Sequence, residues 1–333
     1  MRNSMFKALV LKETENKQNT LSIEDLSIED LPKEEILVKV EFSTLNYKDS
    51  LAVTNKLPIV KSYPMVPGID FAGTVKKSSN INFNIGDKVL LNGAGLGEIT
   101  WGGMSQMACV KGDYLIKIPS AFSTMQAMTI GTAGYTAMLA ILALEKNKIT
   151  PDKGEILVTG ATGGVGSVSL MLLAKLGYNV CAVTGKTKNF EYLKSLGAER
   201  IIDRNDLSKE CRPLEKEVWA GVVDTVGSQI LANACASVKY GGALVLCGLA
   251  QGFDFPTTVM PFILRGINLF GIDSVYCPLE LRQEAWERLA KDIDLEKLQS
   301  IALSISFNEV LDYAKKMLAG NTKGRIIVDV NMT

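Results

Sequence analysis

Residues 155–167 read E-I-L-V-T-G-A-T-G-G-V-G-S, and this stretch decides the predicted fold. The apolar run at 156–158 predicts a short strand, the glycines after it indicate a turn, and the apolar segment 168–176 predicts a helix. Because glycine lacks a Cβ, the turn lets backbone N–H groups approach a pyrophosphate at the helix N-terminus. The spacing is one residue longer than the common dinucleotide pattern, so an ordinary turn stays the alternative. The glycines expected to bind are Gly160, Gly163 and Gly166.

The residues after this turn favour the dinucleotide fold. Further strands are predicted beyond the first helix, and helical segments separate them. They lie at 178–184, 200–203, 218–224 and 243–247. Strands that alternate with helices indicate an α/β fold with a parallel, doubly wound sheet of the Rossmann type.

Composition sets outer bounds on function. The 333 residues are 47% apolar and 22% charged, which is typical of a globular enzyme with room for two domains. The 36 basic and 36 acidic side chains balance, which argues against nucleic acid or an anionic membrane surface as a partner. We find no apolar run of the roughly 18 residues that a membrane span needs and no signal-peptide core, so a cytoplasmic location is expected.

Cysteine and histidine usage narrows the chemistry. Six cysteines are scattered without a C-x-x-C pair, so we expect them to be reduced rather than bridged or metal-bound. The chain has no histidine, which removes Ser-His and Cys-His pairs and histidine-ligated metal sites. Catalysis is therefore expected from a cofactor or from Tyr, Lys, Asp, Glu, Asn and Arg side chains.

The first hundred residues predict a separate, mainly β domain. Strands are indicated at 6–11 and 35–42, with turn signals such as Pro67-Gly68 between such runs. The polar stretch L-N-Y-K-D at 45–49 follows a strand directly, where functional sites are often built. The alternative for this stretch is a helix cap with a surface tyrosine.

The remaining segments are predicted from periodicity. The small residues at 131–137 open an apolar helix that runs to residue 144. Apolar residues at 307–318 have the spacing of an amphipathic helix, which Gly320 would end. A last strand is expected at 326–330.

Several motifs occur in order along nearly the whole chain. They are L-N-Y-K-D at 45–49, P-G-I-D-F-A-G at 67–73, W-G-G at 101–103, G-T-A-G at 131–134, the glycine turn at 159–166, E-Y-L-K-S-L-G-A at 191–198, D-T-V-G at 224–227 and P-T-T-V-M-P-F at 256–262. With them the sequence resembles medium-chain dehydrogenases/reductases of the zinc-independent quinone-oxidoreductase type. Within that type it is most similar to the acrylyl-CoA reductase (NADPH) subgroup, of which the runs at 212–216 and 256–262 are typical.

The resemblance implies a domain plan and a metal-free site. It implies a discontinuous GroES-like catalytic domain at 1–127 and 300–333, a Rossmann-type NADPH-binding domain at 128–299, and a homodimer joined through the strand at 268–272. Zinc-dependent relatives bind catalytic zinc through Cys and His at the positions of Asn46 and Ile69, and structural zinc through four closely spaced cysteines. This chain lacks both sets, so no metal is expected.

The expected cofactor is NADPH. The second strand of the predicted sheet ends V-T-G-K-T-K at 183–188, without the acid that accepts a ribose hydroxyl in NAD-binding folds. Lys186, with Arg204 after the next strand, suits a 2′-phosphate, and a solvated surface lysine is the alternative. The expected cofactor-binding residues are Tyr47, Thr132, Gly160, Thr162, Gly163, Gly164, Val165, Gly166, Thr184, Gly185, Lys186, Arg204, Leu249, Ser274 and Arg325.

The expected reaction is reduction of the C=C bond of acrylyl-CoA to propanoyl-CoA, as the resemblance implies. Hydride would add to the β-carbon and a proton to the α-carbon, which needs neither zinc nor histidine. The nearest alternative is an NADPH:quinone oxidoreductase, followed by a non-enzymatic NADPH-binding protein. Asn46 and Ile69 contradict a zinc alcohol dehydrogenase.

The expected catalytic residues are Tyr47, Asn46 and Asp49. Tyr47 would face the nicotinamide and protonate the α-carbon, since a phenol keeps its proton at neutral pH; packing alone, with water as the donor, is the alternative. Asn46 would offer its amide to the developing oxyanion, which is worth about 3 kcal/mol in the transition state. Asp49 would order the loop, and Arg325 would reach a cofactor or CoA phosphate or else lie at the surface.

Overall fold

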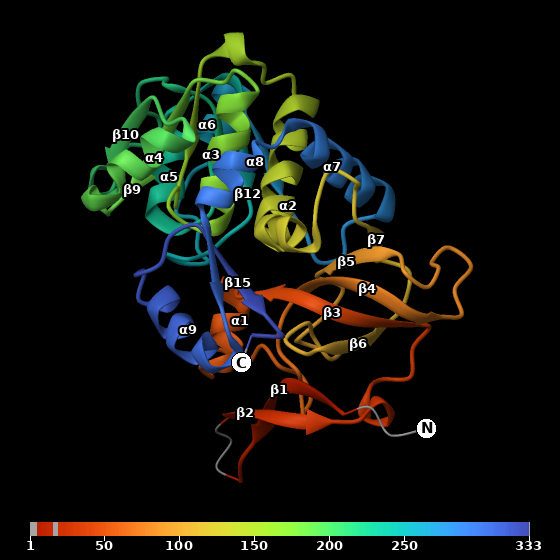
Figure 1. The fold of residues 1–333 in the computed structure, drawn as a ribbon. Coiled ribbons are helices and arrows are strands. Elements are labelled where there is room, and N and C mark those ends of the chain that lie inside the picture. Colours follow the sequence, from red (N-terminus) through yellow and green to blue (C-terminus); the bar gives the residue numbers. More distant parts are fainter. Residues whose placement is uncertain (1–4, 16–18, 333) are drawn as a thin grey trace. The chain divides into compact units, whose positions relative to one another are not determined.

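The structure, a computed structural model, describes residues 5–15 and 19–332, and its contacts divide the chain into two units (Figure 1). Unit 1 comprises Met1–Thr132, Ser274–Trp286 and Gln299–Thr333, and unit 2 comprises Ala133–Asp273 and Glu287–Leu298. The stretch at 274–286 therefore belongs with unit 1, although the sequence analysis placed it in the inserted domain. Hydrogen bonds hold it there, because Arg282 Nη1 donates to Asn92 O (2.7 Å) and Trp286 Nε1 to Asn92 Oδ1 (3.3 Å).

Unit 2 is built on a parallel sheet whose strands follow the order β10-β9-β8-β11-β12-β13. The strands are β8 (Glu155–Val158), β9 (Val180–Thr184), β10 (Arg200–Asp203), β11 (Trp219–Asp224), β12 (Val238–Leu246) and β13 (Asn268–Gly271). This confirms the predicted doubly wound sheet. The strand order reverses between β8 and β11, the point at which such sheets bind ligands, and the glycine turn follows β8 there.

Helices cover this sheet: α3 packs on β8 and β9, and α5 packs on β11 and β12. The helical segments of this part of the chain are η2 (Pro151–Lys153), α3 (Gly164–Lys175), η3 (Thr187–Asn189), α4 (Phe190–Leu196), η4 (Arg204–Leu207), α5 (Ser228–Ala236), α6 (Met260–Arg265), α7 (Leu279–Asp292) and α8 (Leu295–Ser300). Helix α3 begins at Gly164, before the predicted start at Val168. Apolar periodicity missed this first turn because glycines form it.

Helix α2 (Thr124–Lys146) differs from its predicted form. It begins before Gly131, where the helix was expected to open, and Gly131 interrupts it with φ 51° and ψ −159°. By length and composition alone, α2 is as long and apolar as a membrane span, a feature that the sequence analysis did not identify. Most of α2 is buried inside the fold, so packing accounts for its apolar character.

Unit 1 is mainly β, as predicted. Its larger sheet follows the order β14-β15-β3-β4-β5-β7, with β6 paired to β3, and β1 and β2 form a separate antiparallel pair. The strands are β1 (Phe6–Glu13), β2 (Asn19–Leu26), β3 (Ile36–Thr44), β4 (Asp70–Ser78), β5 (Lys88–Asn92), β6 (Met107–Val110), β7 (Ile116–Lys117), β14 (Ala302–Ile305) and β15 (Arg325–Asp329). The C-terminal strand β15 thus returns to the N-terminal sheet, with Ile327 opposite Thr44 on β3.

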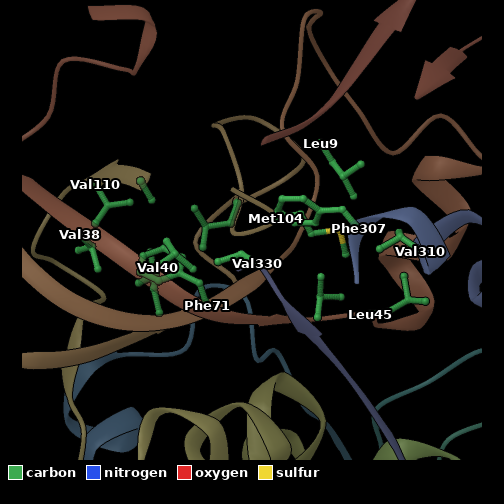
Figure 2. Packing of buried hydrophobic residues seen from close by; sticks show 14 of the residues in the cluster. Leu9, Val38, Val40, Leu45, Phe71, Met104, Val110, Phe307, Val310 and Val330 are labelled. Carbon is green, nitrogen blue, oxygen red and sulfur yellow. The ribbon is translucent and has the colours of Figure 1, made fainter. Parts of the chain in front are cut away.

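The core of unit 1 fixes the end of β3 and the helix that follows it. Val38 and Val40 of β3 pack with Phe71, Met104 and other buried apolar side chains (Figure 2). The helical segments of unit 1 are η1 (Ile28–Asp30), α1 (Tyr47–Val53), η5 (Phe307–Glu309) and α9 (Val310–Leu318). Helices α1 and α9 lie against each other, and Leu45, two residues before α1, is fully buried. The polar stretch at 45–49 is therefore held by a packed core.

Candidate functional site

The polar stretch at 45–49 forms the start of helix α1. Asn46 is the N-cap, and Asp49 accepts hydrogen bonds from the Asn46 backbone N–H (2.8 Å) and from the Ile69 N–H (3.0 Å). The first bond closes a capping box, which satisfies backbone donors that a helix start leaves free. Asp49 thus orders this loop, as expected, and the helix-cap alternative also describes the local structure.

A buried carboxylate, Asp70, gathers the residues around this helix start. Its Oδ1 accepts from Thr44 Oγ1 (2.6 Å), and its Oδ2 accepts from the Thr132 N–H (2.7 Å), Thr132 Oγ1 (2.7 Å) and Asn46 Nδ2 (3.3 Å). Such a carboxylate is tolerated in the interior because donors surround it. Asp70 lies within the motif at 67–73, and no role was predicted for it. The available signal was an acid between the apolar residues Ile69 and Phe71.

The Asn46 amide has a different use from the one predicted. Its Nδ2 donates to Thr44 Oγ1 (2.9 Å), Asp49 Oδ2 (3.1 Å) and Asp70 Oδ2. An amide nitrogen has two hydrogens, and both are directed at acceptors inside this cluster. In this arrangement Asn46 is not available as an oxyanion donor, so it acts as a structural link between three buried groups.

Arg325 is not at the surface. It is 3% exposed, and it donates from Nε to Thr129 O (2.9 Å) and from Nη1 to Asn46 Oδ1 (3.2 Å). Burial lowers the pKa of Arg325, and the negative charges of Asp70 and Asp49 oppose that shift. The surface alternative is therefore wrong, and the contact with a cofactor or CoA phosphate stays a prediction. Arg325 is the first residue of β15, and the pairing of β15 with β3 places it beside the end of β3.

The pKa of Asp49 is shifted because Asp49 is buried close to a second carboxylate, Asp70. Burial, and then the negative charge of Asp70, raise the pKa of Asp49 to about 7, against the hydrogen bonds from Asn46 and Ile69. The folded state therefore holds a proton on Asp49 at pH values where the unfolded chain, with its ordinary aspartate pKa near 4, has lost it.

We expect the free energy of unfolding to fall as pH rises from about 4 to about 7, and the Asp49 contribution to stay constant above that, because the folded state binds more protons in this window. The fall due to Asp49 is on the order of 4 kcal/mol. Asp49→Asn has no titrating group and should lack it. Urea unfolding of both proteins at several pH values measures the difference, and parallel pH profiles would contradict the assignment.

Tyr47 is the first residue of α1, next to this buried cluster along the chain. Tyr47 is 39% exposed, whereas Asn46 and Asp49 are buried. Tyr47 lies in the first turn of a helix whose N-cap is buried. Its backbone is therefore fixed, while its phenol is accessible to a ligand. Of the predicted catalytic residues, Tyr47 is therefore the one whose side chain is accessible to a ligand.

The glycine turn of unit 2 has the features of a nucleotide cradle. Gly160 has φ 57°, and Gly163 is the N-cap of α3 and is exposed. A Cβ on Gly166 would lie 2.4 Å from Gly160 O, so only glycine lets the helix start pack on the turn. Gly164 and Val165 are partly exposed and Thr162 is buried. The N-terminus of α3 therefore presents backbone N–H groups where an anion would bind.

A second buried carboxylate braces this turn, and the sequence analysis did not single it out. Asp224, at the end of β11, accepts from Thr159 Oγ1 (2.7 Å) and from the Gly227 N–H (2.7 Å). The Thr225 N–H donates to the same Thr159 hydroxyl (3.0 Å). These bonds join the ends of β8 and β11 and hold the first glycine of the turn in place.

Three cations lie together at the end of β9. The Arg204 side chain lies close to Gly185, where a Cβ would be 2.4 Å from Arg204 Nε. The Lys186 N–H donates to Thr184 Oγ1 (3.1 Å). Partial burial, and then the positive charges of Lys188 and Arg204, lower the pKa of Lys186. Mutual repulsion of this kind is relieved when an anion binds.

The remaining predicted residues are divided between the units. Leu249 follows β12 in unit 2 and is exposed, whereas Ser274 and Thr132 belong to unit 1. The Ser274 carbonyl accepts from Arg282 Nη2 (3.4 Å). In unit 1 the structure brings together Asn46, Asp49, Thr132 and Arg325. In unit 2 the glycine turn and the segment 184–186 follow the neighbouring strands β8 and β9.

Comparison with known proteins places the chain in a family. The Alcohol dehydrogenase GroES-like domain family matches residues 32–120, and the Zinc-binding dehydrogenase family matches residues 164–291. The chain is 48% identical over 329 residues to Acrylyl-CoA reductase AcuI from Ruegeria pomeroyi, covering 98% of this chain and all of the relative. The chain therefore belongs to the medium-chain dehydrogenases/reductases, and within them to the quinone-oxidoreductase type that includes the acrylyl-CoA reductases.

Solved structures agree with this assignment. The crystal structure of the yhdH oxidoreductase from Salmonella enterica in complex with NADP has a TM-score of 0.95 and 48% identity, covering 97% of this chain and 99% of that one. The crystal structure of Bacillus subtilis protein yhfP with NAD bound has a TM-score of 0.95 and 42% identity, covering 98% and 99%.

The name of the second family implies zinc, but the residues here do not fit that ion. Asn46 and Ile69 offer an amide already in use and an aliphatic side chain, and the chain has no histidine. In the parts of the chain that the structure describes, no three His, Cys, Asp or Glu side chains cluster as metal ligands would. The buried Arg325 guanidinium contributes the positive charge in this cluster. No step of the chemistry is therefore assigned to zinc.

Proposed function

We propose that the chain is an NADPH-dependent reductase that converts acrylyl-CoA to propanoyl-CoA. The observation that carries this proposal is the 48% identity, over the full length of the relative, to a protein named acrylyl-CoA reductase. The balanced reaction is acrylyl-CoA plus NADPH plus a proton, giving propanoyl-CoA and NADP⁺. An α,β-unsaturated thioester needs only hydride at the β-carbon and a proton at the α-carbon, which suits a chain without histidine.

The residues of unit 2 fit NADPH. The exposed N–H groups at the start of α3 would bind the pyrophosphate, and Lys186 with Arg204 would bind the 2′-phosphate. The Salmonella structure carries NADP and the Bacillus structure carries NAD, so relatives differ in the nucleotide bound. The cation cluster at the end of β9 supports the phosphorylated cofactor for this chain.

In the proposed mechanism the chain positions the acceptor and supplies a proton. Bound NADPH supplies the hydride. Tyr47 offers its hydroxyl to the α-carbon, and its backbone is fixed because Asn46 and Asp49 cap the helix that it begins. Asp70 holds Asn46 and Thr132 in place, and it is buried and contacts no substrate.

Tyr47→Phe tests the proton-donor role. With NADPH saturating, we expect kcat for acrylyl-CoA to fall about 10-fold or more, since a positioned general acid contributes on the order of 100-fold and water partly replaces it. Steady-state kinetics against wild type measures this. An unchanged kcat removes the acid role, and a raised KM for NADPH with kcat intact would leave Tyr47 a binding residue only.

The function itself is tested by NADPH oxidation with a panel of acrylyl-CoA, crotonyl-CoA and quinones. We expect acrylyl-CoA to give the highest kcat/KM, with propanoyl-CoA as the product identified by mass spectrometry. Rapid NADPH oxidation with quinones and none with acrylyl-CoA would replace the proposal by a quinone oxidoreductase. Inactivity toward the whole panel would favour a non-enzymatic NADPH-binding protein.

We further propose a homodimer that forms through β13. This strand ends the sheet order of unit 2, and the adjoining α6 carries exposed apolar side chains, among them Ile263, 72% exposed. A sheet edge flanked by such side chains pairs readily with a second copy.

The six free cysteines support the cytoplasmic location proposed for this dimer, because a reducing compartment keeps thiols unpaired.

A double variant, Ile263→Glu with Leu269→Asp, should convert the dimer to a monomer, because charged side chains on β13 and α6 would be buried in the interface. Size-exclusion chromatography with light scattering measures the mass. Ile81→Glu, which changes another exposed isoleucine in unit 1, serves as the control and should stay dimeric. A monomeric wild type would contradict the proposal.

A further inference from the structure

A buried guanidinium connects three segments of unit 1 that are distant in sequence. β15 places Arg325 beside the end of β3, where the Leu45 N–H donates to Ile326 O (3.0 Å). From there Arg325 donates to Asn46 Oδ1 at the start of α1 and to Thr129 O in α2. The planar fork of an arginine makes these two bonds in fixed directions, which a lysine ammonium does not.

The chain leaves room for this guanidinium by interrupting α2. A Cβ on Gly131 would lie 2.4 Å from Arg325 Nη2 and 3.1 Å from Asp70 Oδ2, and the φ of Gly131 is 51°. Nη2 itself is buried, and it has no hydrogen-bond partner among the described residues. The arginine is thus accommodated at the cost of a helix break and an unsatisfied donor, which a simple packing residue would not require.

The contact determines the orientation of Asn46. Because Arg325 Nη1 donates to Oδ1, the amide is fixed with Nδ2 toward Thr44, Asp49 and Asp70. In this orientation Asn46 caps α1. Its backbone carbonyl accepts from the Ser50 N–H (3.0 Å), which closes the first turn of the helix that Tyr47 begins.

We propose that Arg325 is a positioning residue for the proposed reductase reaction. Its guanidinium holds Asn46, and through Asn46 the first turn of α1 that presents Tyr47, without contacting nucleotide or substrate. The inference rests on the proposed function for its kinetic consequence, while the hold on α1 is a property of unit 1 alone.

The test compares Arg325→Met and Arg325→Lys with wild type. For Arg325→Met we expect kcat to fall about 10-fold per folded molecule, no further than in Tyr47→Phe because Arg325 acts through Tyr47, with KM for NADPH changed less than about twofold, the split typical of lost positioning. Arg325→Lys restores the charge but not the fork, so it should recover only part of kcat. Hydrogen exchange of the Ser50 amide should be more than about 10-fold faster in Arg325→Met, since α1 loses its fixed cap.

Arg265→Met is the matched control. Arg265 is also a largely buried arginine, and its guanidinium donates to the carbonyls of Ala236 and Val238 in unit 2. Its loss should lower the melting temperature without changing kcat per folded molecule or exchange in α1. Folded protein is counted by NADPH titration, so a variant that is only partly folded still gives a kcat per site. If Arg325→Met fails to fold, the inference is tested by kcat and Ser50 amide exchange in Arg325→Lys alone.

Three results would overturn the inference. They are kcat within about twofold of wild type, a raised KM for NADPH with kcat intact, and unchanged exchange of the Ser50 amide. The second would make Arg325 a phosphate ligand. Failure of the proposed function is seen separately, as a wild type that does not reduce acrylyl-CoA. The variants are then assayed with whichever acceptor wild type reduces, and the exchange result stands for any acceptor.

Discussion

Asp70→Ala is expected to destabilise the protein by about 4 kcal/mol, because it leaves buried donors of Thr44 and Thr132 unsatisfied and removes the larger of the two negative charges that act on the buried Arg325. The carboxylate is fully buried and accepts four hydrogen bonds. Removal of one partner of a buried charge cluster typically costs 3–5 kcal/mol, far more than removal of a surface acid.

Urea unfolding measures this loss. The control is Asp113→Ala, which removes an exposed acid of the same unit and should change stability by less than about 0.5 kcal/mol. Asp70→Ala should also unfold at a melting temperature lower by on the order of 10 °C. Equal stability of the two variants would show that the cluster around Asp70 contributes little to the fold.

Lys186→Glu is expected to lower kcat/KM for NADPH about 100-fold, which corresponds to about 2.7 kcal/mol, while kcat/KM for NADH changes less than about threefold. The substitution replaces a cation close to Arg204 with an acid. It removes an attraction to the 2′-phosphate, and the new carboxylate would pair with Arg204. An acid near the end of the second strand is also what NAD-binding folds use to accept the ribose hydroxyl.

The measurement is steady-state kinetics with both nucleotides. Lys209→Glu, an equal change of charge at an exposed lysine of the same unit, is the control and should leave the NADPH/NADH ratio unchanged. Equal losses for the two nucleotides in Lys186→Glu would assign Lys186 to general affinity and not to the phosphate. Comparable kcat/KM for NADPH and NADH in wild type would remove the cofactor proposal itself.

The structure agrees with the role predicted for Asp49, but it gives Asn46 and Arg325 contacts that were not predicted, and the reason is physical. Asp49 was expected to order its loop. It accepts hydrogen bonds from Asn46, three residues earlier, and from Ile69, the residue before β4. Asn46 and Arg325 were assigned contacts with ligands, whereas the structure pairs them with each other. Local sequence indicates that a polar residue follows a strand, but it does not show which buried group that residue meets.

The sequence by itself determined the parallel sheet of unit 2, the glycine turn after β8, the mainly β character of unit 1 and the exclusion of histidine chemistry. These features depend on residue periodicity, glycine spacing and composition, which are local properties of the chain. Only the tertiary structure decided the cluster of Asp70, Asn46, Thr132 and Arg325, the break of α2 at Gly131 and the place of 274–286 in unit 1. Each of these depends on hydrogen bonds and close contacts between segments far apart in sequence, and no periodicity within one segment specifies its distant partner.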